Sequence, residues 1–228
     1  MKKLIVLNHK MNLDYDEVYD YITKLNNIKT NNDIIVCPSN IYLTDFINNC
    51  SWGVASQNVS DKESGNYTGE VSTTQLKSLG VEYSIIGHYE RKKYFNETNK
   101  IINKKLIACL ETNIIPILCF GETGQQNDTI TSLDELLKNI ENINFIIFAY
   151  EPLKVIENES ITKIKEQIET IYNYLYEKYN TEPNIIYGGG ISKKDINELL
   201  DSKKINGILI GKVSSDIEKC EKIITGIN

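Results

Sequence analysis

The sequence is poor in long apolar runs and in paired cysteines, and each shortage excludes a class of protein. No apolar run approaches the roughly 18 residues that a membrane span requires, so we expect no transmembrane segment. The five cysteines are scattered without a C-x-x-C pair, which fits a reducing cytosol better than a disulfide framework or a zinc site. The formal charge of −6 argues against nucleic acid as the main partner. These features predict a soluble, cytoplasmic protein with no nucleic-acid or membrane partner.

Histidine, arginine and tryptophan are also scarce. The chain has two histidines (His9 and His88), one arginine (Arg91) and one tryptophan (Trp52). Isoleucine, asparagine and lysine occur 36, 26 and 24 times, a bias that we attribute to AT-rich codons and not to function. Against that background each rare residue is a stronger candidate for a specific role.

Eight short apolar runs, rich in Ile and Val, recur along the chain. They occupy residues 4–7, 34–37, 53–56, 83–86, 114–120, 143–150, 184–187 and 205–210. Most are continuous and not alternating, as in parallel strands that are covered on both faces. The first run is expected to be such a strand and not a signal peptide, because Asn8, His9 and Lys10 interrupt it and it has no small-residue cleavage site.

Helical periodicity fills the gaps between these runs. Apolar residues step at three and four from 161 to 175, from 133 to 140, from 196 to 200 and from 217 to 224. Helix starts are predicted at Ser132–Glu135, Ser192–Asp195 and Ser215–Glu218, which resemble capping boxes. Eight strand–helix units predict one α/β domain over residues 1–228, a closed (β/α)8 barrel. A doubly wound open sheet is the alternative, but no G-x-G-x-x-G follows the first strand.

Polar residues, charged residues and glycines that could take part in catalysis or binding follow seven of these predicted strands. They lie in residues 8–12, 56–58, 87–91, 119–122, 150–152, 188–190 and 211–212. In a (β/α)8 barrel the carboxyl ends of the strands carry the active site, so Lys10, His88 and Glu151 should point into one pocket. Any one of these residues alone could be a solvated loop charge, a tight turn or a surface ion pair. For His9 we expect simple packing over the barrel mouth.

The same segments resemble the triosephosphate isomerase family over nearly the whole chain. Residues 8–12, NHKMN, look like its N-W-K-M-N, with His9 in place of tryptophan. Residues 83–98, YSIIGHYERKKYFNET, resemble its most specific segment, Y-V-I-I-G-H-S-E-R-R…F…E-T. The segments ASQNVS, GNYTGEVS, PILCFGET, FAYEP, IIYGGG and INGILIGK also occur in the family's order. The resemblance implies a TIM barrel and an isomerase of glycolysis and gluconeogenesis.

The resemblance also implies a reaction: interconversion of dihydroxyacetone phosphate and D-glyceraldehyde 3-phosphate by proton transfer through an enediolate. Glu151 would be the base, His88 a neutral electrophile, Lys10 the stabiliser of negative charge, and Asn8 the residue that orients the substrate. A Glu base with a neutral His is a documented pattern for this enzyme. No cofactor or metal is implied.

Further residues receive roles from the same resemblance. Substrate binding would involve Gly189, Gly190, Gly211 and Lys212. Glu90 would hold Lys10, Arg91 would pin the neighbouring loop, and Cys119 matches a family cysteine near the site. Thr68 would reach into a partner subunit's site, which implies a homodimer.

The chain departs from the family's pattern mainly where phosphate should bind. The lid after Glu151, V-W-A-I-G-T-G in the family, reads LKVIENE over residues 153–159, so that Glu157 and Glu159 replace its two glycines. Gly190 replaces a serine, Lys212 replaces a glycine and would add positive charge, and Tyr89 replaces a small serine.

These departures leave three interpretations open. The first is a triosephosphate isomerase with a remodelled lid. The second is a sister isomerase for another small phosphosugar, such as a tetrulose phosphate. The third is a catalytically weak paralogue with a binding role, against which the retention of Lys10, His88 and Glu151 argues. A phosphate-binding barrel of the tryptophan-biosynthesis type fits worse, because it does not explain GHYER or AYEP.

Overall fold

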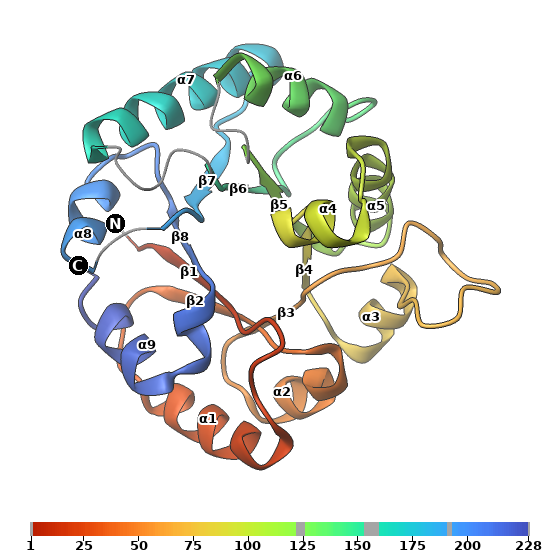
Figure 1. The fold of residues 1–228 in the computed structure, drawn as a ribbon, viewed down its shortest axis with the longest axis vertical. Helices are drawn as coiled ribbons and strands as arrows, with labels where there is room; N and C mark the ends of the chain where they lie inside the picture. The colour runs from red at the N-terminus through yellow and green to blue at the C-terminus, as the bar shows by residue number, and fades with distance from the viewer. Residues whose placement is uncertain (1, 122–125, 153–159, 191–192, 228) are drawn as a thin grey trace.

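A closed barrel of eight parallel strands forms the centre of the molecule (Figure 1). The computed structural model describes residues 2–121, 126–152, 160–190 and 193–227. The strands are paired in chain order: β1 (Leu4–Asn8), β2 (Asp33–Cys37), β3 (Gly53–Ser56), β4 (Tyr83–Ile86), β5 (Ile115–Phe120), β6 (Ile147–Tyr150), β7 (Asn184–Tyr187) and β8 (Gly207–Ile210). The predicted (β/α)8 barrel is confirmed, and the open doubly wound sheet is wrong.

Helices surround the barrel on its outer side (Figure 1). They are α1 (Tyr15–Asn27), α2 (Leu43–Asn49), α3 (Thr73–Leu79), α4 (Tyr89–Phe95), α5 (Asn99–Glu111), α6 (Gln126–Leu136), α7 (Ile161–Tyr179), α8 (Lys193–Leu200) and α9 (Ile217–Ile224), with 3-10 turns η1 (Asn40–Tyr42) and η2 (Lys212–Ser215). The stripe predicted on residues 161–175 is confirmed in α7, whose Ile164, Ile168, Ile171 and Leu175 are buried. None of the described helices is long and apolar enough to cross a membrane.

Two of the predicted helix starts are wrong. Ser132 and Glu135 lie inside α6, where both accept hydrogen bonds from the Asn99 side chain and so join α6 to α5. At α9 the helix is capped by Asp216, whose carboxylate accepts from the backbone N–H of Lys219 at 3.1 Å. The start predicted at Ser192–Asp195 involves Ser192, which lies outside the described residues.

The sixth and eighth strands begin later than predicted. Ile143 and Ile146 are buried, but β6 begins at Ile147, and α6 ends before Ile140. The barrel closes between β1 and β8, where Leu4 pairs with Gly207. A Cβ on Gly207 would lie 1.9 Å from the carbonyl oxygen of Leu4, so this close approach of two strands requires glycine.

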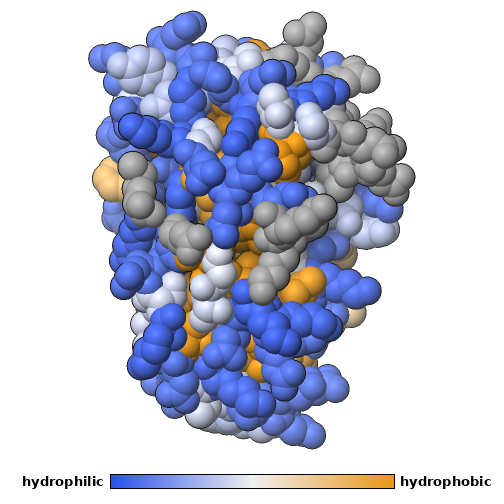
Figure 2. Space-filling model, turned by 90° about the vertical axis from the view of Figure 1, so that its left-hand side faces the viewer, coloured by the Kyte–Doolittle hydropathy of each residue, from blue (hydrophilic) through white to orange (hydrophobic). Residues whose placement is uncertain are grey.

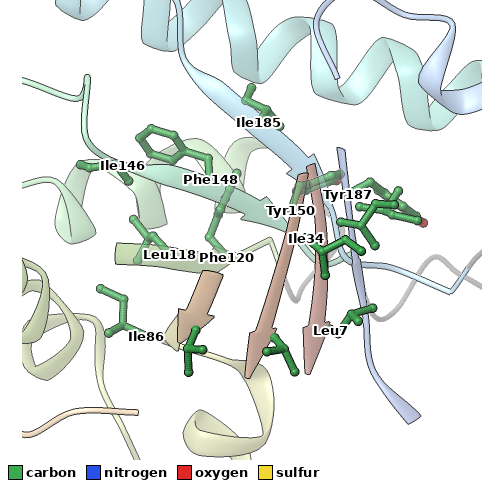
Figure 3. Packing of buried hydrophobic residues seen from close by; sticks show 14 of the residues in the cluster. Leu7, Ile34, Ile86, Leu118, Phe120, Ile146, Phe148, Tyr150, Ile185 and Tyr187 are labelled. Atoms are coloured by element: carbon green, nitrogen blue, oxygen red, sulfur yellow. The ribbon is translucent and has the colours of Figure 1, made fainter. Parts of the chain in front are cut away.

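Two hydrophobic layers form the core. One fills the barrel, with inward side chains such as Val6, Cys119 and Ala149. The other lies between the strands and the helices and includes Phe120, Phe148 and Tyr150, which pack together in Figure 3. The outer surface in Figure 2 is largely hydrophilic, and hydrophobic residues show mainly in the gaps between polar ones.

His9 belongs to the outer of these layers and not to the barrel mouth. His9 lies two residues beyond Leu7, an outward residue of β1, and so points to the same side. Its ring contacts the rings of Tyr21 and Phe46 at centroid distances of 4.5 and 5.6 Å. Neither ring nitrogen has a hydrogen-bond partner among the described residues, and burial lowers the pKa of His9 to about 3. The expected packing role is confirmed, but the predicted place over the barrel mouth is wrong, because the ring packs against Tyr21 of α1 and Phe46 of α2.

This buried imidazole should make the protein sensitive to acid. Between pH 6.5 and 3 the unfolded chain binds a proton at His9 that the folded chain excludes, so stability is lost as the pH falls through that window. We expect His9→Phe to recover about 2 kcal/mol of unfolding free energy at pH 5, relative to its effect at pH 8. Urea unfolding at both pH values measures this, and an equal effect at both would contradict it.

Candidate active site

Side chains alternate between the two faces of each strand, and this determines which of them point into the barrel mouth at the carboxyl ends of the strands. Val6 and Ala149 point into the barrel interior, so Asn8 and Glu151, two residues further along, are expected to point to the same side at its mouth. Both are buried, at 4% and 3% exposure. From the sequence, these residues are expected at the rim because they lie at the carboxyl ends of predicted barrel strands.

His88 and Glu151 face each other at this rim. His88 Nε2 lies 3.5 Å from Glu151 Oε1. The backbone N–H of Glu90 donates to His88 Nδ1 at 3.3 Å, so the proton of the neutral ring resides on Nε2 and is directed at the Glu151 side. The pKa of His88 is lowered to about 4, mainly by burial; the Glu90 carboxylate opposes this shift, and the Lys10 charge contributes to it. The imidazole is therefore neutral at pH 7 and presents a hydrogen-bond donor.

The Glu151 carboxyl group lies in a tight surrounding. A Cβ on Gly188 would lie 2.7 Å from Glu151 Cγ, so glycine at the end of β7 makes room for the carboxylate. Cys119 is fully buried, and burial together with the Glu151 carboxylate raises the pKa of the thiol well above its ordinary value. Cys119 is thus a protonated thiol at pH 7.

Lys10 is held in an unusual backbone conformation. Its φ of 54° is left-handed, which costs a non-glycine residue about 1 kcal/mol or more. Three hydrogen bonds hold its peptide groups: the N–H donates to Asn8 Oδ1 at 3.1 Å, and the carbonyl accepts from Ser39 Oγ at 3.0 Å and Gln57 Nε2 at 2.8 Å. No sequence motif assigns a role to Ser39. Gln57 lies after the third strand, two positions beyond inward-facing Ala55, and its contact with Lys10 is not predicted by the sequence.

The Lys10 ammonium group reaches the same rim. Lys10 Nζ donates to Glu90 Oε1 at 2.6 Å, the contact that the family resemblance implies. A Cβ on Gly211 would lie 3.2 Å from Lys10 Cε, so the lysine side chain runs against the end of β8. Lys10, His88, Glu90 and Glu151 therefore form one chain of neighbouring groups.

The glycines after β7 and β8 line one cavity of about 230 Å³. Gly188, Gly189, Gly190, Gly211 and Lys212 form one wall, and the rest of the lining is apolar: Ile196, Ile208, Leu209, Ile210, Val213 and Ile223. Because Gly188 touches Glu151 and Gly211 touches Lys10, the cavity adjoins the charged groups. Backbone N–H groups at glycine-rich strand ends commonly bind phosphate, so the arrangement suits a small anion next to a carboxylate and a neutral imidazole.

Comparison with known proteins decides the family. The family model for triosephosphate isomerase matches residues 3–227. The chain belongs to the triosephosphate isomerase family. Proteins named triosephosphate isomerase are similar to it: one from Mesomycoplasma hyopneumoniae (strain 7448), 33% identical over 98% of this chain and 99% of that protein, and one from Aquifex aeolicus, 31% identical over 98% and 99%. A third, from Mycoplasma genitalium, is 34% identical over 95% of both chains.

The other residues that the triosephosphate isomerase resemblance singled out lie outside this group. Arg91 Nε donates to the buried Glu97 at 2.8 Å, and Glu97 also accepts from the buried Lys105 at 2.6 Å. This carboxylate, which the sequence did not assign, anchors the turn after α4. Thr68 is exposed on the loop that projects beside α3 in Figure 1. The lid residues 153–159, including Glu157 and Glu159, lie outside the described residues.

Proposed function

We propose that this isomerase interconverts dihydroxyacetone phosphate and D-glyceraldehyde 3-phosphate through an enediolate. The observation that carries the proposal is the 3.5 Å approach of His88 Nε2 to Glu151 Oε1, beside Lys10 and a glycine-lined cavity. A proton-transfer isomerase needs a base, a donor to the carbonyl oxygen and a positive charge near the developing oxyanion. The rim supplies one candidate for each.

Glu151 is the proposed base. Its carboxylate removes a proton from C1 of dihydroxyacetone phosphate, and the electron pair of that C–H bond forms the C1–C2 double bond of the enediolate. The C2 carbonyl oxygen becomes the oxyanion. Protonated Glu151 then returns the proton to C2, which leaves a carbonyl at C1.

His88 and Lys10 stabilise the charge that develops. The neutral His88 ring donates its Nε2 proton to the oxygens, and it can move a proton between O2 and O1 without leaving a cation. Lys10, held against Glu90 and Gly211, supplies the positive charge. Asn8 fixes the Lys10 backbone through its amide oxygen and orients the substrate. The phosphate group occupies the cavity lined by Gly189, Gly190, Gly211 and Lys212.

A second substrate is favoured by one observation. Lys212 is exposed and lines the phosphate cavity where the family has a glycine, so the cavity carries an added charge. A tetrulose phosphate or a similar phosphosugar is therefore the competing candidate. A coupled assay with purified protein distinguishes them. We expect faster turnover with glyceraldehyde 3-phosphate; background rates there, with turnover of a four-carbon ketose phosphate, would select the alternative.

The protein is also proposed to be a homodimer of the cytoplasm. Large hydrophobic side chains are exposed on the loops after β1 and β2 and on α4: Met11 (93%), Ile41 (77%), Tyr94 (62%) and Phe95 (61%). The loop that carries Thr68 projects from the neighbouring part of the barrel (Figure 1). A second copy that covers these residues would bring Thr68 to its partner's site.

The dimer is tested by mass in solution. Sedimentation should give twice the 26.0 kDa of one chain. Phe95→Glu places a charge in the proposed contact and should shift the mass toward one chain, whereas Phe145→Glu, at an exposed residue just before β6, should not. A wild-type mass of one chain at micromolar concentration would contradict the proposal.

A further inference from the structure

The Lys10 side chain has other neighbours besides the Glu90 carboxylate with which it forms an ion pair. Glu90 Oε1 lies 2.6 Å from Nζ on one side, and the backbone of Gly211 lies against the end of the side chain. The ring of Tyr89 contributes a further contact, with its centroid 5.8 Å from Nζ. That distance is within the range of a cation–π interaction. The position of the ammonium group is therefore set by a carboxylate, a glycine backbone and an aromatic face.

Tyr89 is placed there by the same turn that orients His88. It is the first residue of α4, immediately after His88, whose ring nitrogen Nδ1 accepts from the backbone N–H of Glu90. The Tyr89 ring is half-buried and lies 5.1 Å from the His88 ring, inclined at 42°. One side chain thus adjoins both the lysine and the histidine of the rim.

An aromatic face acts differently from a carboxylate on a nearby cation. Glu90 attracts the ammonium group strongly, but it also neutralises its charge toward other anions. The negative face of the Tyr89 ring attracts the cation without adding a net charge, and its carbon atoms exclude water from one side of the ammonium group. A lysine that is partly shielded from water interacts more strongly with an anion that approaches its open side.

We propose that Tyr89 is a positioning residue that acts through Lys10 and tightens the binding of the phosphorylated substrate. The inference rests on the proposed function for the identity of that substrate, and it deepens it by assigning a role to a residue that departs from the family's small serine. The ring face is the functional part. The hydroxyl group has no role in this account.

Two variants of Tyr89 distinguish the effect of its aromatic ring face from the effect of its size. Tyr89→Leu keeps an apolar side chain but removes the π face, and we expect it to raise both KM for glyceraldehyde 3-phosphate and Kd for inorganic phosphate about fivefold, with a smaller change in kcat. Tyr89→Phe is the conservative variant and should restore phosphate binding to within about twofold of wild type. A Phe variant as weak as the Leu variant would overturn the proposal.

A double-mutant cycle shows whether Tyr89 acts through Lys10. Calorimetry gives Kd for inorganic phosphate in wild type, Tyr89→Leu, Lys10→Met and the double variant. We expect Tyr89→Leu to have little further effect once Lys10 is replaced. Losses that simply multiply would contradict a role through Lys10, as would a change confined to kcat or to the unfolding midpoint.

The same cycle keeps this inference separate from the proposed function. If the wild type binds phosphate but does not turn over triose phosphate, the proposed function fails while the coupling between Tyr89 and Lys10 still decides the inference. If the wild type binds no phosphate, both are contradicted.

Discussion

Glu151→Gln should lower kcat for triose phosphate isomerisation about a thousandfold, because the amide cannot accept the carbon-bound proton. The shape of the side chain is conserved, so the contacts with Gly188 and His88 should persist and KM should change little. Steady-state kinetics in the coupled assay measure both constants. A variant with more than a tenth of wild-type kcat would exclude Glu151 as the base.

A matched substitution controls for the loss of a carboxylate as such. Glu111 is the last residue of α5 and is exposed. It precedes the amino end of β5, at the end of the barrel opposite to the rim that carries Glu151. Glu111→Gln should leave kcat and KM at wild-type values. A thousandfold loss restricted to position 151 then assigns the effect to proton transfer and not to the net charge of the protein.

Lys10→Met should produce the second large effect. Removal of one preorganised positive group at a developing oxyanion costs on the order of a hundredfold to a thousandfold in kcat. Here the loss also leaves Glu90 without its 2.6 Å partner beside an anionic substrate, so kcat/KM should fall further than kcat. Steady-state kinetics at several substrate concentrations give kcat and KM separately. A change in KM alone would contradict a role in stabilising the enediolate.

Lys212→Met is the control for this prediction. Lys212 lines the phosphate cavity but is exposed, and an exposed charge is screened by water and salt. We expect a rise in KM of less than about tenfold with kcat nearly unchanged. An effect of Lys212→Met as large as that of Lys10→Met would shift the main positive charge of the site to Lys212.

The strand pattern could be predicted from the sequence because it depends on local composition. Eight Ile- and Val-rich runs mark the barrel, and the residues at the carboxyl ends of these runs, Asn8 and Glu151 among them, are expected at its mouth. Because successive side chains of a strand point to opposite faces, His9 points away from the site and packs against Tyr21. The Lys10–Glu90 ion pair joins residues 80 positions apart, and the family resemblance supplied it where periodicity could not.

Other features depend on competition between neighbours that a local pattern does not resolve. Ser215 and Glu218 match a capping box, but Asp216 accepts the backbone N–H of Lys219 and starts α9 one residue later. Ser132 and Glu135 match another, yet they bind Asn99 of the adjacent helix. The contacts of Gln57 and Ser39 with the Lys10 carbonyl arise only when three loops meet at the rim.

The central claim, that Glu151 carries a proton between two carbons of a triose phosphate, is tested most directly by hydrogen exchange in D2O. Dihydroxyacetone phosphate is incubated with wild type and with Glu151→Gln, and deuterium at carbon is followed by proton NMR. The account predicts deuterium incorporation by the wild type and almost none by the variant over the same time. Equal incorporation by the variant, or isomerisation by the variant at the wild-type rate, would contradict it.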